Sequence, residues 1–198
     1  MRIRLATVSA AALMLAAPAF AQQTSRVAPS TNANPSMVST AATQKLDRAD
    51  MDFAKKAAEG GMAEVELGKL AQQNAKDAQV KQFGARMEQD HSQANSQLQS
   101  IASQKGLQLP TQLDAKDQKE LDRLSRLHGA AFDQAYMRAM VQDHDKDAKE
   151  FKRQAQTARD PDLKNFAQQT LNVIEQHDQM AHSVMQATTA SGSSRERR

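Results

Sequence analysis

The sequence contains no cysteine, and only 4% of its 198 residues are aromatic. Without cysteine the chain can form neither a disulfide nor a thiolate metal site, and it has no cysteine to carry a lipid anchor. After residue 21 no run of about 18 residues is apolar enough to span a membrane. The low aromatic content suits a slim core of Ala, Leu, Met and Phe. Because cysteine is absent, side chains with nitrogen or oxygen atoms are the main candidates for metal ligands.

The N-terminus has the pattern of an export signal. Arg2 and Arg4 precede the apolar run LATVSAAALMLAAPAF, which leads into the small-x-small triplet Ala19, Phe20, Ala21. The run is too short for a membrane span, and the triplet is typical of a cleavage site. The sequence thus predicts a signal peptide over residues 1–21 and an exported protein, periplasmic or envelope-associated in a bacterium with two membranes.

Charge is balanced after the predicted cleavage. Loss of Arg2 and Arg4 leaves 24 basic against 23 acidic residues, a net charge of +1, and three of the arginines lie in the tail SRERR. A nucleic-acid-binding protein needs a concentrated basic face, so this class is excluded. The sequence identifies neither a partner nor an oligomeric state.

Composition divides the mature chain into three parts. Residues 22–45 are rich in Ser, Thr, Asn, Ala and Pro without an apolar period, which predicts a disordered leader. Residues 188–198 predict a disordered basic tail on the same grounds. Residues 46–187 lie between them and are long enough for one domain with a real core.

Helix-forming residues with apolar positions three and four apart fill this domain, whereas glycine and proline are confined to a few places. Asp77, Asp114 and Asp160 are placed to cap helices, Gly106 to end one, and Pro161 to begin one. The predicted helices cover residues 47–74, 77–105, 115–127, 130–158 and 161–186. We therefore expect an all-α antiparallel four-helix bundle, with a short extra helix between its second and third long helices.

The pentapeptide Met-x-Gln-Asp-His occurs at Met87–His91 and again at Met140–His144. His91 and His144 fall on the apolar stripes of their helices, and so does His177 on the last helix. Counted from the tight turns, the three histidines lie at a similar height, with Glu64 about one turn away on the first helix. Gly60 and Gly61, at the height of His91, are expected to leave room for the imidazoles.

This inward layer has two interpretations. In the first, His91, His144, His177 and Glu64 bind a transition metal such as zinc, copper or iron, with Asp90 and Asp143 as outer partners of the ligands. An aspartate adjacent to a histidine points about 100 degrees away and would more naturally serve a neighbouring helix. In the second, the histidines are neutral core residues that hydrogen-bond to one another, to Glu64 and to Gln or Asp, and that fix the helix register.

Other chemistry has less support. Glu88 and His91 match half of a di-iron signature, but Val141 replaces the carboxylate in the second copy. His128 lies at a helix end as a cap, and His182 points off the stripe. No pattern suggests a nucleophile elbow or a phosphate loop. No catalytic or cofactor-binding residue is predicted.

Three segments carry a resemblance to a known family. The stretch from EGGMAEVELGKLAQQ to GLQLP, the segment GAAFDQAYMRAMVQDH and the segment DPDLKNFAQQTLNVIEQHDQMA resemble domain of unknown function 4142, a family of exported bacterial proteins often labelled outer membrane proteins. The resemblance covers about Asp47 to Met185. It implies a ferritin-like helical bundle and export, and it implies no established activity. The label of outer membrane protein has no support in this sequence, because the sequence shows no pattern of barrel strands.

The sequence therefore predicts an exported helical bundle that acts as a non-catalytic binding or envelope-stress accessory protein. The alternative is a transition-metal-binding or metal-dependent redox protein that uses the inward histidines.

Overall fold

All regular secondary structure in the described residues, 45–196, is helical. The computed structural model has five helices there, α1 (Arg48–Asn74), α2 (Ala78–Gln104), α3 (Ala115–Ser125), α4 (Gly129–Thr157) and α5 (Pro161–Glu196). The all-α prediction is confirmed. The described helices include none that combines the length and the apolarity needed to cross a membrane. The predicted signal peptide and residues 22–44 of the predicted leader lie outside the described residues, as do residues 197–198.

Aspartates begin four of the helices. The side chains of Asp47, Asp77 and Asp114 accept hydrogen bonds from backbone N–H groups in the first turns of α1, α2 and α3, at 2.7–2.8 Å. Asp160 accepts from the N–H groups of Asp162 and Leu163, with Pro161 first in α5. These bonds satisfy donors that have no partner inside the helix. The starts predicted at Asp77, Asp114 and Asp160 are confirmed.

The helix boundaries differ from the prediction at two positions. Gly106 follows α2 in the left-handed region, with a φ of 67°, as its predicted role as a helix stop requires. His128 occupies the N-cap position of α4, but its side chain makes no capping hydrogen bond. The predicted end of the last helix near residue 186 is wrong, because α5 continues to Glu196. No proline interrupts this stretch, and the Thr188 hydroxyl bonds to the carbonyl of Met185 within the helix. The domain limit predicted at residue 187 stays a prediction.

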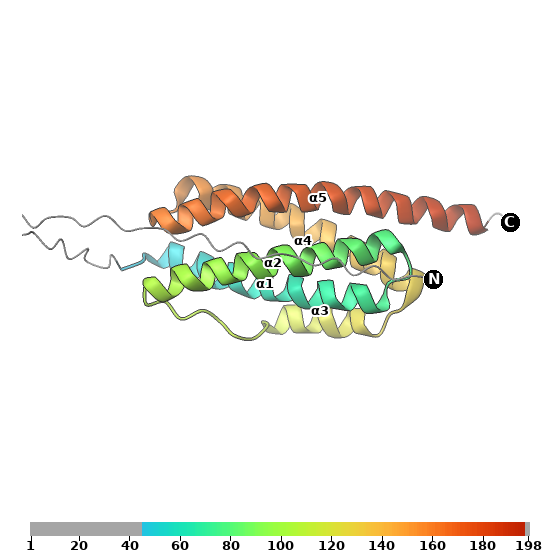
Figure 1. Cartoon of the computed structure of the whole chain (residues 1–198), viewed down its shortest axis with the longest axis horizontal. Helices are drawn as coiled ribbons and strands as arrows, with labels where there is room; N and C mark the ends of the chain where they lie inside the picture. The colour runs from blue at the N-terminus through green and yellow to red at the C-terminus, as the bar shows by residue number, and fades with distance from the viewer. Residues whose placement is uncertain (1–44, 197–198) are drawn as a thin grey trace, which may run out of the picture. The chain divides into compact units, whose positions relative to one another are not determined.

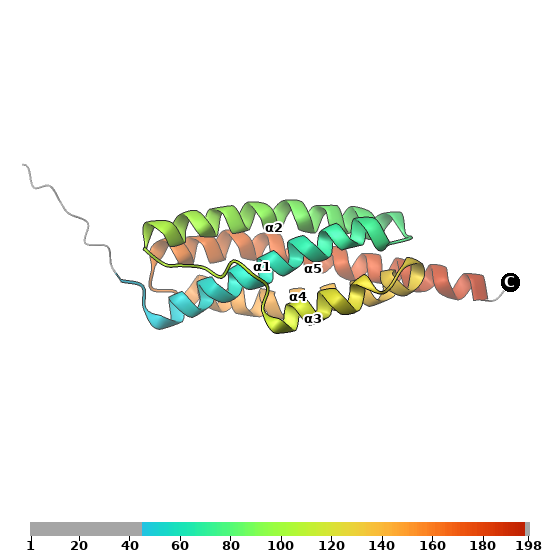
Figure 2. The ribbon, with the colours of Figure 1, turned by 90° about the horizontal axis from the view of Figure 1, so that it is seen from below.

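Four long helices pack as two hairpins. α1 lies along α2, and α4 lies along α5, while α2 contacts α5 across the hairpins (Figure 1). The α1–α4 side is the least closely packed of the four, and the short helix α3 lies along it (Figure 2). Among the residues of α3, only Leu124 is buried. One side of the helical unit is therefore covered by a short and shallowly packed helix.

Two glycines let α1 and α2 approach closely. A Cβ atom on Gly68 would lie 2.5 Å from the carbonyl oxygen of Gly84, and one on Gly84 would lie 2.8 Å from the carbonyl oxygen of Gly68. Both distances are too short for any side chain, so the two backbones meet directly. Any larger residue at either position would push the helices apart.

Each hairpin turn is held by a buried carboxylate of the other hairpin. Asp133 of α4 accepts hydrogen bonds of 3.0 Å from the N–H groups of Lys76 and Asp77, between α1 and α2. Asp50 of α1 accepts from the N–H groups of Arg159 and Asp160, between α4 and α5. Both aspartates are at most 4% exposed. Backbone donors in the turns are thereby satisfied across the hairpin interface.

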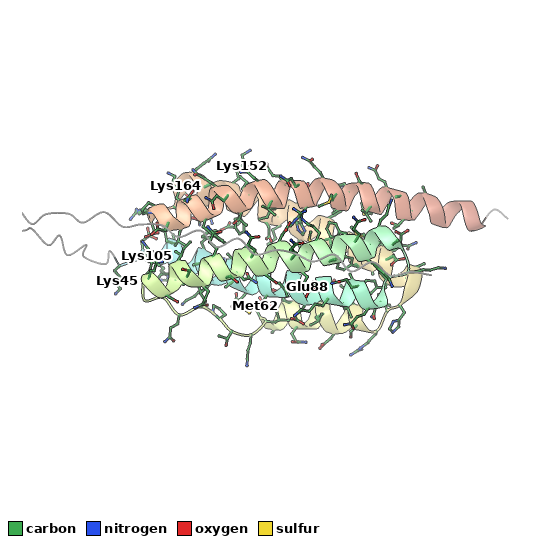
Figure 3. The ribbon with its side chains drawn as sticks, viewed as in Figure 1. Lys45, Met62, Glu88, Lys105, Lys152 and Lys164 are labelled. Atoms are coloured by element: carbon green, nitrogen blue, oxygen red, sulfur yellow. The ribbon has the colours of Figure 1, made fainter. Side chains whose placement is uncertain are left out.

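A partly buried lysine adds a further link between the hairpins. Lys105, at the end of α2, is labelled in Figure 3 close to the start of α5. Its Nζ lies 2.8 Å from a carboxylate oxygen of Asp160 and 2.6 Å from one of Asp162. Because Asp160 is also the N-cap of α5, this ion pair joins the two hairpins where the last helix begins.

Two apolar clusters make up the core, and a polar layer separates them. The first contains Met87, Met140 and Ala181, and the second contains Leu98, Phe151 and Ile174. On α2, α4 and α5 the residue between the two clusters is a buried histidine, at positions 91, 144 and 177. On α1, Glu64 lies between Ala58 of the second cluster and Leu67 of the first. The predicted common height of the three histidines is confirmed, and Glu64 lies in the same layer.

Candidate metal centre

Three histidines from three helices meet in the layer between the apolar clusters. His91 of α2 is 8% exposed, His144 of α4 is 2% exposed and His177 of α5 is 1% exposed. Their ring centroids are separated by 5.3–5.9 Å. One ring nitrogen of each lies within 4.8 Å of a ring nitrogen of the other two. This spacing is small enough for one ion to bind all three after modest ring movement, because zinc–nitrogen bonds measure about 2.0–2.1 Å.

Hydrogen bonds on the outside of the group orient two of the rings. Nδ1 of His144 lies 2.9 Å from the backbone carbonyl oxygen of Met140, one turn earlier. Nε2 of His177 lies 2.9 Å from a carboxylate oxygen of Asp90, which also accepts from Arg86. In both pairs the acceptor requires the histidine nitrogen to carry the proton. The other ring nitrogen is then left with a free lone pair, as in metal-binding histidines.

The nitrogens left free are buried and have no partner in the protein. Nε2 of His91, Nε2 of His144 and Nδ1 of His177 form no hydrogen bond within the described part of the chain, and each is closed to solvent. A buried polar atom without a partner costs roughly 1–3 kcal/mol. The histidine layer has three such unpaired atoms in one place. A metal ion bound there would remove the free-energy cost of all three.

Burial keeps the imidazoles neutral. Desolvation lowers the pKa of His91 well below its ordinary value, and the neighbouring His144 and His177 lower it further. The pKa of His144 falls to about 4, chiefly through burial, although its bond to Met140 opposes the shift. Burial also lowers the pKa of His177, against the opposing influence of Asp90. Near neutral pH all three rings are therefore unprotonated at one nitrogen and can act as ligands.

Glu64 shares the layer but not the histidine group. It does not belong to the set of side chains whose ligand atoms lie within 4.8 Å of one another. Its Oε2 is buried without a hydrogen-bond partner, and its pKa is raised well above the ordinary value by burial and by the nearby charges of Asp143 and Asp147. The hydroxyl of Tyr136, also buried, has no partner either, and the charge of Glu64 contributes to its raised pKa.

The glycines near the layer have different roles from the one predicted. A Cβ atom on Gly61 would collide with the side-chain amide of Asn95, so this glycine makes room for an asparagine rather than for an imidazole. A Cβ atom on Gly60 would have no neighbour within 4 Å. Gly60 therefore faces open space, in a cavity that it shares with Glu64 and His91.

The aspartates that precede His91 and His144 in the sequence interact with side chains of other helices. Asp90 follows the expectation that a residue adjacent to His91 serves a neighbouring helix, since it holds His177 of α5. Asp143 faces Glu64 instead of a histidine. Glu88, half of the di-iron pattern, accepts a 2.7 Å hydrogen bond from Gln72 of α1. The sequence pattern located the three inward histidines but could not show which carboxylate pairs with which ring.

A second group of metal-ligand side chains lies outside the layer. Ligand atoms of Asp145, Asp178 and His182 lie within 4.8 Å of one another, and His182 Nε2 is 3.7 Å from Asp178. Asp145 is exposed, and the other two are partly exposed. We call these three residues the outer group, and His91, His144 and His177 the buried group. Sequence reasoning missed the outer group, although Asp145 and Asp178 each follow a buried histidine.

Comparisons with known proteins place this site in a family without an assigned activity. Residues 35–184 match the family described as Domain of unknown function (DUF4142), so the chain belongs to that family. No curated protein matches the chain. A crystal structure of a DUF305 fragment from Deinococcus radiodurans has a similar fold, with a TM-score of 0.64 and 12% identity. The alignment covers 72% of this chain and 98% of the fragment. At this identity the likeness concerns the fold alone.

Proposed function

We propose that this protein binds a transition-metal ion through His91, His144 and His177. The observation that carries the proposal is the set of three buried ring nitrogens without partners, in an arrangement that already bonds the opposite nitrogens of His144 and His177. Neutral imidazole is a good ligand for zinc, copper and iron. Three protein ligands leave a fourth position for water or another ligand. Bound copper or iron would add a redox role, whereas zinc would not.

A purely structural layer is the competing interpretation. Polar layers that fix helix register are satisfied by hydrogen bonds among their members. Here the inward nitrogens of the histidines have no such partner, and Glu64 Oε2 also lacks one. The arrangement resembles a set of oriented ligands more than a closed hydrogen-bond network. Metal binding therefore accounts for the layer better than register alone.

The finer architecture and the location belong to the same proposal. The ring α1, α2, α5, α4 with its internal polar layer supports a ferritin-like antiparallel four-helix bundle, in which metal sites are built between facing helices. The arginines and apolar run of residues 1–21 support export to the periplasm. In that compartment the protein would serve as a metal-binding accessory of the envelope rather than as an enzyme.

Titration of chelator-stripped protein tests the proposal. Zn²⁺, Cu²⁺ and Fe²⁺ are added separately, and the melting temperature and the bound metal are measured. A metal bound at 100 times its Kd should add about 2.7 kcal/mol to the stability of the folded state. Replacement of His91, His144 or His177 by Ala should abolish this rise.

The control variants separate the buried group from the rest of the chain. His128→Ala changes a histidine whose side chain makes no capping bond and should leave the rise intact. His182→Ala removes the outer group, so a rise that survives it comes from the buried group. If none of the three metals raises the melting temperature of the wild type, the buried group is a packing device and the proposal fails.

A further inference from the structure

A large cavity adjoins the buried group on one side. It has a volume of about 1170 Å³ and lies where α1, α3 and α4 meet, on the least closely packed side of the helical unit. Its wall includes exposed side chains, among them Lys119, Asp122 and Lys149, and it also includes the buried His91. The cavity therefore connects solvent with the histidine layer.

Of the three ligands, only His91 lines this cavity. Its Nε2 has no hydrogen-bond partner, and the residue is 8% exposed. On the other sides, the outer nitrogens of His144 and His177 are bonded to Met140 and Asp90. An ion that reaches the layer from the cavity would meet the His91 ring before the other two, and a small rotation of this ring would be needed to present its buried Nε2.

Among the carboxylates that line the same cavity as His91, three lie close enough to influence one another. Glu64 comes from α1, and Asp143 and Asp147 come from successive turns of α4. Burial and the charge of Asp143 raise the pKa of Asp147 to about 6, and burial with both aspartates raises the pKa of Glu64. Like charges in a desolvated place repel one another, and a bound cation would relieve that repulsion. Glu64 also brings a buried oxygen without a partner.

We propose that the metal ion reaches the buried group through this cavity, and that Glu64, Asp143 and Asp147 bind it in transit before His91 does. This inference rests on the proposed function. Carboxylate oxygens are weaker ligands than imidazoles for zinc and copper, so the ion passes on to the histidines. The three carboxylates set the rate of loading, whereas the three histidines set the affinity.

Basic residues also line the cavity, so its carboxylates attract a cation only over a short distance. The charges of Lys116 and Lys146 lower the pKa of Asp143 and Asp147 and partly offset the mutual repulsion of the carboxylates. The cavity wall as a whole carries both signs of charge. Long-range attraction of cations is therefore not expected, and the carboxylates act as ligand atoms in the wall of the cavity that His91 also lines.

Loading kinetics provide the test. Cu²⁺ and Zn²⁺ are transferred separately from a weak chromophoric chelator to stripped protein in a stopped-flow instrument. The triple variant Glu64→Gln, Asp143→Asn, Asp147→Asn should load more slowly than the wild type, because the cavity wall loses three carboxylate ligand groups. Its stoichiometry at equilibrium should be unchanged, because all three histidines remain. Glu175→Gln is the matched control, since Glu175 is an exposed carboxylate of α5 outside the cavity wall.

A steric variant tests the route without any change of charge. Gly60 lines the cavity, and a Cβ atom there has free space, so Gly60→Leu should fold while its side chain narrows the passage. We expect slower loading in Gly60→Leu than in Gly60→Ala, with equal stoichiometry. Wild-type loading rates in both Gly60→Leu and the carboxylate variant would overturn the route and leave the metal site intact. Failure of the wild type to bind metal at equilibrium would overturn both proposals.

Discussion

Two histidines of α5 pair with aspartates in opposite surroundings. In the buried group, His177 is 1% exposed and bonds Asp90 of another helix at 2.9 Å. In the outer group, His182 pairs with Asp178 of its own helix at 3.7 Å, and its side chain is 45% exposed. Only the first pair fixes a ring toward two other rings.

The difference shows that proximity of ligand atoms is not enough to define a site. Both groups bring three ligand atoms within 4.8 Å of one another. In the outer group, Asp145 is exposed and His182 is half-exposed, so water reaches both side chains, and Oδ1 of Asp178 is the one ligand atom among the three that is buried without a hydrogen-bond partner. In the buried group, one ring nitrogen of every member is closed to solvent and has no partner, so three such atoms require an explanation.

The largest expected difference is in the pH dependence of stability. The folded pKa of each buried histidine lies below its unfolded value, so as pH falls from 7 to 4 the unfolded state takes up protons that the folded state does not. Folding stability is therefore lost in this window, on the order of 3 kcal/mol from His144 alone, whose folded pKa is about 4. Replacement of all three by Gln should flatten the acid limb, measured by urea unfolding at each pH.

The raised pKa values of two carboxyl groups have the opposite effect on how stability changes with pH. Glu64 and Asp147 are protonated more readily in the folded state, so they add stability as pH falls through the same range. They remain in the glutamine variant, whose acid limb should then level or rise slightly. The matched control changes Asp145 and Asp178 to Asn and His182 to Gln, and it should keep the wild-type limb. Equal slopes in the wild type and the buried-group variant would show that these histidines are already solvated or charged.

The two aspartates allow a matched comparison of metal affinity. Asp90→Ala removes the acceptor that orients His177, and such outer partners contribute roughly 10–100-fold to metal affinity. We expect that loss with unchanged stoichiometry at the buried group, measured by competition with a chelator. Asp178→Ala removes the corresponding partner of His182 and should leave the tight binding unaltered. Similar losses in both variants would mean that the general charge, not the orientation of the ring, is what matters.

The smallest expected effect concerns the outer pair. An exposed i,i+4 ion pair contributes about 0.3–0.5 kcal/mol. His182→Ala should therefore change the free energy of unfolding of metal-free protein by no more than that amount at pH 7. A loss above about 1 kcal/mol would show that the outer group supports the helix packing as firmly as the buried group does.

Much of the fold could be predicted because its signals are local. Asp77, Asp114 and Asp160 cap helices through bonds to residues two or three positions away, and a left-handed residue such as Gly106 ends a helix by its own conformation. The end of α5 was missed because Ser, Thr and Ala neither stop a helix nor require one. The histidine layer was predictable because three stripes with a three-four spacing place His91, His144 and His177 among apolar residues.

The remainder of the site depends on contacts between distant parts of the chain. Asp90 and His177 are 87 residues apart, and no local pattern pairs them. Glu64 was expected beside the histidines, but its position depends on how closely α1 packs against α4, and this is the least closely packed side of the helical unit. The cavity lies on the same side. Helical periodicity gives the face on which a side chain lies, and it does not give the width of the space in front of that face.

The exchange of Asp50 and Asp133 between the hairpins has a consequence for folding cooperativity. Each turn needs a carboxylate that only the other hairpin supplies, so neither half can satisfy its own turn. The histidine layer is divided in the same way, with His91 on one hairpin and His144 and His177 on the other. A separated half would therefore lack both the carboxylate that holds its turn and the histidines of the other half. Assembly of the hairpins and completion of the histidine group are one event.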